Sequence, residues 1–102
     1  MARVLVGRLD ALPAGVPRLL EIEGRRLVLA RVGDAVYACA EACAHRGGPL
    51  SEGKLSGTRL ACPRHGWHYD VRTGRCVFPG RGAAVPTYPV EIVDGEIHLE
   101  LP

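Results

Sequence analysis

Two short motifs each pair a cysteine with a histidine, and their residue types are those of metal ligands. The first is Cys43-x-His45 and the second is Cys62-x-x-His65, with sixteen residues between them. Both lie in stretches rich in Gly and Pro, which favour turns. Two thiolates and two neutral imidazoles make a complete ligand set, and these ligand types suit either a tetrahedral zinc ion or an iron–sulfur cluster.

The chain around these motifs predicts short β-strands. No segment shows a convincing helical period, and apolar runs are separated by X-Gly or Gly-X pairs that are typical of hairpin turns. Residues 27–30 are continuously apolar, so we expect a strand that is buried on both faces or belongs to a closed sheet. The expected strands are residues 3–9, 19–22, 25–32, 35–38, 58–61, 67–71, 90–93 and 96–101.

The middle of the chain differs in character from its two ends. Gly, Pro, Cys and His concentrate in residues 39–82, where only two short strands are expected and a metal centre would replace a large core. We therefore expect one domain over residues 1–102. Its β scaffold would consist of residues 1–38 and 83–102, and residues 39–82 would form an inserted metal-binding subdomain.

Composition and charge exclude several classes of protein. The 102 residues include 13 basic and 11 acidic residues, too even a balance for a nucleic-acid-binding protein. No apolar run is long enough to span a membrane, and the N-terminus lacks the pattern of a secretory signal. We expect a cytoplasmic protein, where cysteines serve more often as metal ligands than in disulfides.

The combined pattern resembles the signature of the Rieske [2Fe–2S] family. The resemblance rests on Cys43-x-His45 and on Cys62-Pro63-x-His65-Gly66 with their sixteen-residue spacing. It extends through the sequences HRGGPL (45–50), GWHYD (66–70) and RTG (72–74), and to the hairpins expected at Glu23-Gly24 and Asp94-Gly95.

This resemblance implies an all-β fold, an antiparallel β sandwich or barrel with an inserted cluster-binding loop subdomain. It implies one [2Fe–2S] cluster per chain, with Cys43 and Cys62 on one iron and His45 and His65 on the other. Two imidazoles in place of two thiolates make the cluster less negative, so its potential rises above that of a four-cysteine ferredoxin.

Three positions depart from the pattern of Rieske proteins in respiratory and photosynthetic complexes. Gly48 and Arg64 stand where those proteins have a disulfide beside the cluster, and Trp67 stands where they have a serine that bonds a cluster sulfide. Fewer hydrogen bonds to sulfur stabilise the reduced cluster less. We therefore expect a potential near the low end of the class, roughly −150 mV or slightly above.

The resemblance implies a small ferredoxin that carries single electrons from a reductase to a terminal oxygenase, without being an enzyme itself. Both partners would dock transiently near His45 and His65. The chain has no spare set of two histidines and one carboxylate for an oxygenase iron. Three alternatives stay open: the small subunit of an assimilatory nitrite reductase, a zinc-stabilised binding module and a cluster-based redox or oxygen sensor.

Several further residues have less certain roles. We expect Cys39 and Cys76 to be small buried side chains. We expect His68 to be structural or at the surface, and His98 to lie on the polar face of a hairpin. Arg46 and Arg64 each adjoin a predicted histidine ligand, which leaves partner contact, an effect on potential and simple solvation open. The FPGRG segment around Pro79 is expected to cover the cluster, as the resemblance implies.

Overall fold

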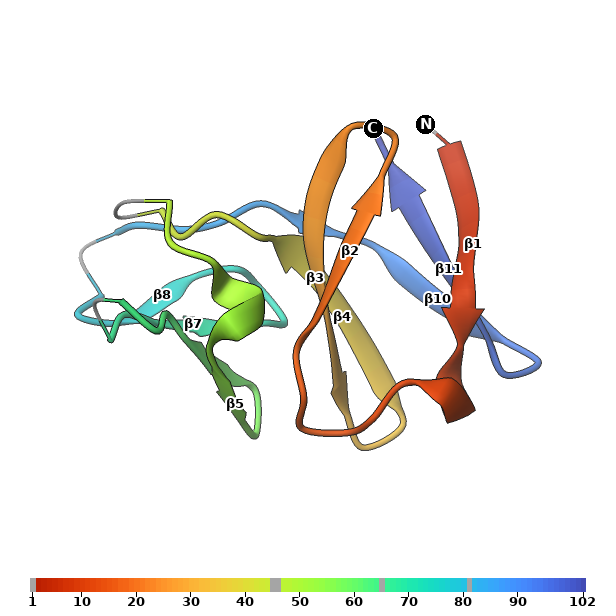
Figure 1. Ribbon diagram of the computed structural model, residues 1–102, viewed down its shortest axis with the longest axis horizontal. Coiled ribbons are helices and arrows are strands. Elements are labelled where there is room, and N and C mark those ends of the chain that lie inside the picture. Colours follow the sequence, from red (N-terminus) through yellow and green to blue (C-terminus); the bar gives the residue numbers. More distant parts are fainter. Residues whose placement is uncertain (1, 45–46, 65, 81) are drawn as a thin grey trace.

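The computed structural model describes residues 2–44, 47–64, 66–80 and 82–102. Within these ranges the chain forms antiparallel sheets and two short 3-10 helices, as the all-β prediction required (Figure 1). In the same ranges no helix is long and apolar enough to cross a membrane. The elements are β1 (Ala2–Arg8), η1 (Leu9–Ala11), β2 (Arg18–Ile22), β3 (Arg25–Val32), β4 (Ala35–Ala40), η2 (Leu50–Glu52), β5 (Lys54–Ser56), β6 (Arg59–Ala61), β7 (His68–Asp70), β8 (Cys76–Phe78), β9 (Thr87–Tyr88), β10 (Val90–Val93) and β11 (Glu96–Leu101).

Two sheets build the scaffold around a shared apolar core. Their strand orders are β1-β11-β10 and β2-β3-β4-β9. Strand β11 alternates as predicted: Ile97, Leu99 and Leu101 are buried, and the polar residues between them are partly exposed. These three side chains pack in one cluster with Leu12, which directly follows η1, and with residues of the facing sheet, namely Leu27, Leu29, Val36 and Ala38. Such a core stabilises the fold by removing apolar surface from water.

The third sheet, β5-β6-β7-β8, has a core of its own. This differs from the prediction in two ways. Strands β5 and β8 were not expected, whereas the equally short β6 and β7 were. The segment also has a substantial apolar core, where a metal centre alone was expected. That core consists of Val28, Ala30, Cys39, Cys43, Leu50, Leu55, Leu60, Cys62, Tyr69, Val71, Cys76 and Val85.

Strand β3 is the wall between the two cores. Leu27 and Leu29 face the scaffold core, whereas Val28 and Ala30 face the core of the third sheet. Successive side chains of a strand point to opposite faces, so a strand covered on both sides needs apolar residues at every position. All four residues are buried, which confirms the prediction of burial on both faces.

Tight turns close the predicted hairpins. Glu23 and Gly24 have φ values of 48° and 75°, and Asp94 and Gly95 have 51° and 77°. A two-residue turn with positive φ at both positions matches the twist of the flanking strands. These turns fix the registers Ile22↔Arg25 and Val93↔Glu96. The hairpins expected at both places are therefore confirmed.

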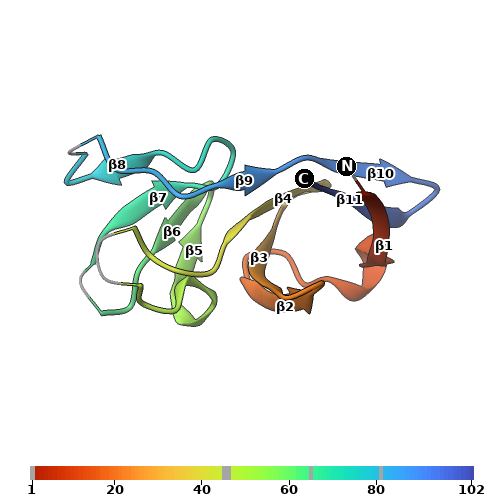
Figure 2. The ribbon, with the colours of Figure 1, turned by 90° about the horizontal axis from the view of Figure 1, so that it is seen from above.

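The molecule is elongated, with principal extents of 38 × 26 × 19 Å. The third sheet lies at one end of the long axis, and the sheet of β1, β11 and β10 lies at the other (Figures 1 and 2). Strand β4 continues to Ala40, and β9 pairs with it through Ala38↔Tyr88 and Cys39↔Thr87. The proposed division of the chain after residues 38 and 82 stays a prediction.

Candidate metal centre

Two loops that start at Cys43 and Cys62 are closed by the same pair of backbone hydrogen bonds. In the first loop the Cys43 N–H donates to the Gly48 oxygen (2.9 Å) and the Gly47 N–H donates to the Cys43 oxygen (2.8 Å). In the second loop the Cys62 N–H donates to the Trp67 oxygen (2.7 Å) and the Gly66 N–H donates to the Cys62 oxygen (3.0 Å). The cysteine at the base of each loop is thereby held in an equivalent backbone setting.

One glycine in each loop has the left-handed backbone conformation that this closure requires. Gly47 has a φ of 69° and Gly66 a φ of 70°, and each follows its cysteine by four residues. Glycine adopts this conformation without the steric cost that a Cβ atom brings. The sequence predicted turns in these Gly-rich stretches, and the structure gives both glycines this specific role in turning the chain.

The first loop is tied to the scaffold by Glu41, which lies at its start. The Glu41 carboxylate accepts hydrogen bonds from the Ser51 N–H (2.7 Å) and the Ser51 hydroxyl (2.6 Å). The Leu50 N–H donates to the Glu41 oxygen, and Ala42 pairs with Pro49 as an isolated bridge. Because Glu41 is buried, these bonds offset the cost of removing its carboxylate from water. The loop therefore enters and leaves from a fixed base.

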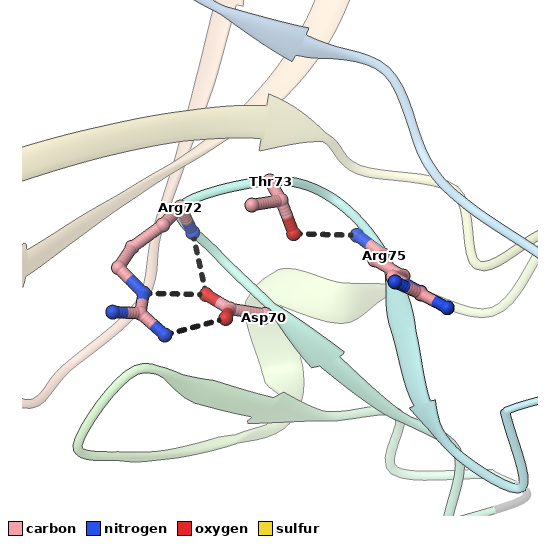
Figure 3. A network of polar contacts seen from close by, with 4 residues as sticks. All are labelled: Asp70, Arg72, Thr73 and Arg75. Carbon is pink, nitrogen blue, oxygen red and sulfur yellow. Dashed lines mark hydrogen bonds and ion pairs between the residues drawn. The ribbon is translucent and has the colours of Figure 1, made fainter.

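The turn between β7 and β8, which lies at the end of β7 opposite the second loop, is held by polar contacts (Figure 3). The Asp70 carboxylate accepts hydrogen bonds from the Arg72 N–H (2.9 Å), Nε (3.0 Å) and Nη2 (2.8 Å). The Thr73 hydroxyl accepts a bond from the Arg75 N–H (3.2 Å). These bonds to Arg72 hold the pKa of Asp70 below its ordinary value. The sequence showed these residues only as part of the family resemblance and gave no role for them.

Both predicted cysteine ligands are buried, and Cys43 is in contact with a phenol. Cys43 Sγ lies 3.1 Å from the Tyr69 hydroxyl, which also accepts a hydrogen bond from the Ala44 N–H (3.1 Å). The pKa of Tyr69 is raised mainly by burial and secondly by the contact with Cys43, so the phenol keeps its proton. When Cys43 is a thiolate, the sulfur can only accept, and the Tyr69 O–H is the donor.

The second cysteine lies against the first loop. A Cβ atom on Gly48 would come within 3.0 Å of Cys62 Sγ, and within 3.5 Å of Cδ of Arg64. The two loops are therefore in close contact at Gly48, and the aliphatic part of Arg64 extends from the second loop across the first. Gly48 and Arg64 occupy the positions where Rieske proteins of respiratory and photosynthetic complexes have two disulfide-bonded cysteines. In this chain the loops are in contact at these positions without a disulfide.

The predicted histidine ligands, His45 and His65, lie outside the described residues, as does Arg46. Elsewhere in the described chain, no three His, Cys, Asp or Glu side chains gather as a further metal site. The two buried sulfur atoms, the phenol aimed at one of them and the close approach of Gly48 to the other fit a centre with thiolate ligands. The assignment of Cys43, His45, Cys62 and His65 as ligands stays a proposal.

The other two cysteines are buried parts of the core. Both are free thiols in the described structure, and burial with the nearby Glu41 raises the pKa of Cys39 to about 12. Cys76 Sγ donates a hydrogen bond to the Phe78 oxygen (3.2 Å). A thiol whose pKa is raised in this way is a poor metal ligand and a poor nucleophile. Their predicted role as small buried side chains is confirmed.

The remaining predicted residues have peripheral positions. His68 is half-buried and its ring lies edge-on to Phe78, with centroids 5.9 Å apart. His98 Nε2 lies 3.6 Å from a Glu96 oxygen on the partly exposed face of β11. Pro79 is exposed, and the expected cover of the cluster by its loop stays a prediction, since Arg81 is outside the described residues. Trp67 packs against the core of the third sheet.

Comparison with known proteins identifies the family. The model of the Rieske [2Fe-2S] domain matches residues 2–89, so the chain belongs to this family. The ferredoxin component of a naphthalene 1,2-dioxygenase system from Pseudomonas aeruginosa is 32% identical over 90 residues, covering 88% of this chain and 86% of that protein. The ferredoxin of carbazole 1,9a-dioxygenase from Nocardioides aromaticivorans IC177 superposes with a TM-score of 0.90 at 32% identity, covering 97% of each chain.

Two further similarities carry less information, one because it covers a small part of the other protein and one because the identity is low. Methylxanthine N1-demethylase NdmA of Pseudomonas putida is 45% identical over 60 residues, and the match covers 59% of this chain but 17% of that protein. A nitrite reductase small subunit from Mycobacterium tuberculosis has a TM-score of 0.86 at 22% identity, covering 96% of this chain and 93% of that one, which shows a common fold only. The curated relatives that match over most of their own length are named as ferredoxin components of oxygenase systems.

Proposed function

We propose that this chain is a one-electron carrier that takes an electron from a reductase and passes it to a terminal oxygenase. A Rieske cluster held by Cys43, Cys62, His45 and His65 would supply the redox chemistry. The observation that carries the proposal is the pair of equivalent loops, each with a buried cysteine at its base, in a chain that matches oxygenase ferredoxins over most of its length.

The chain's own residues would bury the sulfur side of the cluster and control its charge. Cys43 and Cys62 lie within the core of the third sheet, where water is excluded from the sulfur atoms. The Tyr69 hydroxyl would donate to the Cys43 thiolate and stabilise negative charge on it. The sequence did not predict this bond. It would raise the redox potential, and so offset part of the decrease expected from having Trp67 in place of a serine.

The proposed location is the cytoplasm. The buried thiols of Cys39 and Cys76 are free, as expected for a reducing compartment. The proposed partners are a ferredoxin reductase and an oxygenase, docking near His45 and His65. One of the solved structures that this chain resembles is described as a complex of reduced oxygenase and oxidized ferredoxin in carbazole 1,9a-dioxygenase, with a TM-score of 0.87 at 30% identity.

Electron paramagnetic resonance tests this proposal against a zinc-stabilised module. After anaerobic reduction with dithionite, the purified protein should give the signal of a reduced [2Fe–2S] cluster with a low average g value, and His45→Ala or His65→Ala should abolish it. His98→Ala is the matched control and should leave the signal unchanged. A colourless protein that contains zinc and gives no signal would contradict the proposal.

The nitrite reductase small subunit is the second candidate, and its support is the shared fold alone. Purification of the tagged protein from its native cells separates the two candidates. Stable recovery with a large sirohaem-containing chain would favour the nitrite reductase. Recovery of the ferredoxin alone, with reduction by a ferredoxin reductase in a later assay, would favour the oxygenase system.

A further inference from the structure

Charge is unevenly distributed along the sequence. Residues 39–82 contain seven basic and three acidic residues, whereas residues 83–102 contain four acidic residues and no Lys or Arg. The near-neutral total therefore hides two regions of opposite sign. The basic residues are Arg46, Lys54, Arg59, Arg64, Arg72, Arg75 and Arg81; the acidic residues of the second region are Glu91, Asp94, Glu96 and Glu100.

The fold places these two regions at opposite ends of the long axis. The sheet of β5 to β8, with the two cysteine loops, forms one end, and the turn between β10 and β11 lies at the other (Figures 1 and 2). At the acidic end, β1 contributes Arg3, which pairs with Glu91 at 3.3 Å, and Arg8, which pairs with Asp10 at 3.5 Å. Acidic residues still outnumber basic residues in this sheet and in η1.

At the basic end, two of the three carboxylates form hydrogen bonds within the chain, while several exposed cations form no ion pair in the described residues. Glu41 accepts both of its bonds from Ser51, and Asp70 pairs with Arg72, so Glu52 is the one fully exposed carboxylate of residues 39–82 in the described structure. The exposed cations that form no ion pair with any described residue are Lys54, Arg64 and Arg75, whereas Arg59 lies opposite Asp70 and its charge helps to lower the pKa of that carboxyl. The end of the molecule that the third sheet forms therefore carries a net positive charge, and Arg64 is the cation that the structure places at the cysteine loops.

Arg64 brings this positive charge next to the predicted electron port. It directly precedes His65 in the sequence, and its aliphatic part lies over Gly48 of the other loop. Its side chain is exposed and its packing against Gly48 restrains it, so its guanidinium adds a charge near the surface where an electron would leave. A partner approaching the cluster must meet this charge.

We propose that the partner docks on the basic end of this molecule with an acidic protein surface. The proposal rests on the proposed function and adds the chemistry of the partner. Exposed cations at one end and exposed carboxylates at the other form a dipole along the long axis. In the field of an acidic partner, this dipole turns the cluster end forward and keeps the β10–β11 turn away.

Small charged oxidants measure the sign of this field without a partner. The reduced protein would give one electron to ferricyanide, forming ferrocyanide, or one electron to tris(phenanthroline)cobalt(III), forming the cobalt(II) complex. Stopped-flow oxidation is followed at salt concentrations from about 10 mM to 1 M, over which the Debye length falls from roughly 30 Å to 3 Å. Attraction between unlike charges weakens over that range, and repulsion between like charges weakens too.

The proposal predicts opposite salt effects for the two oxidants. The rate with ferricyanide should fall at least about threefold as salt rises, and the rate with the cobalt complex should rise. Arg64→Gln should lower the ferricyanide rate in low salt by about twofold or more. Arg3→Gln, at the opposite end, is the matched control and should leave that rate unchanged. A ferricyanide rate that is constant or rises with salt would overturn the proposal.

A peptide probe tests the preference for carboxylates directly. In low salt, hexaglutamate should slow oxidation by ferricyanide in the wild-type protein and in Arg3→Gln, and should have a weaker effect in Arg64→Gln. Hexalysine should not slow it. Inhibition by hexalysine, or by neither peptide, would contradict the acidic partner. Absence of the reduced-cluster signal would instead show that the proposed function itself has failed, before any rate is measured.

Discussion

The phenol of Tyr69 contacts the sulfur of Cys43, and removing its hydroxyl should lower the midpoint potential of the cluster. A hydrogen bond to a thiolate stabilises the reduced, more negative state of the centre. Tyr69→Phe removes only the hydroxyl and keeps the buried ring. The bond is present in both redox states, so only the difference in its strength shifts the midpoint. A hydrogen bond contributes about 1–2 kcal/mol and 59 mV corresponds to about 1.4 kcal/mol, so we expect the midpoint to fall by roughly 80 mV at most.

Tyr88→Phe is the control for this change. Tyr88 lies on β9 and packs against the scaffold core, away from the core that contains Cys43. Protein-film voltammetry of both variants gives their midpoints directly. Equal midpoints for Tyr69→Phe and the wild-type protein would show that the contact has no effect on the cluster.

Individual site residues could be predicted from the sequence where the residues of a motif lie close together along the chain. Cys43 and Cys62 stand out because their types, spacing and neighbouring glycines occur within a few residues of one another. The contact between Tyr69 and Cys43 joins residues 26 positions apart, and it depends on how β7 pairs with its neighbours. A pattern along the chain carries no signal for such a pair, so its role appears only in the fold.

Gly74, in the turn between β7 and β8, connects the third sheet to the segment that returns to the scaffold. A Cβ atom at this position would clash with the Val85 oxygen, and Gly74 has a φ of 77°. Gly57 has a φ of 58° and no atom within 4 Å of such a Cβ. Gly74→Ala should therefore destabilise the holoprotein by about 1–3 kcal/mol more than Gly57→Ala, through overpacking.

Thermal loss of the cluster's visible absorbance measures both variants against the wild-type protein. The left-handed backbone costs each alanine about 1–2 kcal/mol, so Gly57→Ala should itself be mildly less stable. Equal unfolding temperatures for the two variants would mean that the chain relaxes at Gly74 without loss. In that case the contact with Val85 would not be a constraint on the turn.

The carboxylate of Asp70 makes the stability of the same turn dependent on pH. Its pKa is lowered, chiefly by the hydrogen bonds from Arg72, so its contribution is complete above about pH 4, the ordinary value for an aspartate, and is lost as pH falls through the lowered pKa. Asp70→Asn should therefore lower the unfolding temperature at pH 7. The difference from the wild-type protein should shrink as the solution approaches and passes below pH 4.

The control for this prediction is Asp34→Asn. Asp34 is almost fully exposed and its oxygen lies 3.6 Å from Arg31, a contact of the kind that contributes little. Thermal unfolding of the three proteins from pH 3 to pH 8 gives the comparison. A difference between Asp70→Asn and the wild-type protein that grew toward low pH would have the wrong sign for a lowered pKa.

Among the elements, the two hairpins with an X-Gly turn were predictable, whereas three of the shortest strands, β5, β8 and β9, were not. The turns at Glu23-Gly24 and Asp94-Gly95 carry a local backbone requirement that glycine meets. Strands β5, β8 and β9 have two or three residues each; β5 pairs with the next strand, β8 with the preceding one, and only β9 has a partner far away in the sequence, β4. Their formation depends on the apolar core between the third sheet and β3, which no local pattern reveals.

On the scale of the whole molecule, two cores share the wall formed by β3 and β4. One core belongs to the scaffold and contains only apolar side chains in its buried part, while the other contains all four cysteines. The cysteine loops are thus built on the face of β3 and β4 that lies opposite the scaffold core. This arrangement keeps the predicted electron port at one end of an elongated body, where a partner can reach it.

The most direct test of the account is a coulometric titration of the purified holoprotein under anaerobic conditions. It counts the electrons taken up per chain and gives the midpoint in one experiment. A one-electron carrier of this class should take up one electron, with a midpoint near the low end of the Rieske range, roughly −150 mV or slightly above. Uptake of no electrons, or a midpoint above zero, would contradict the account.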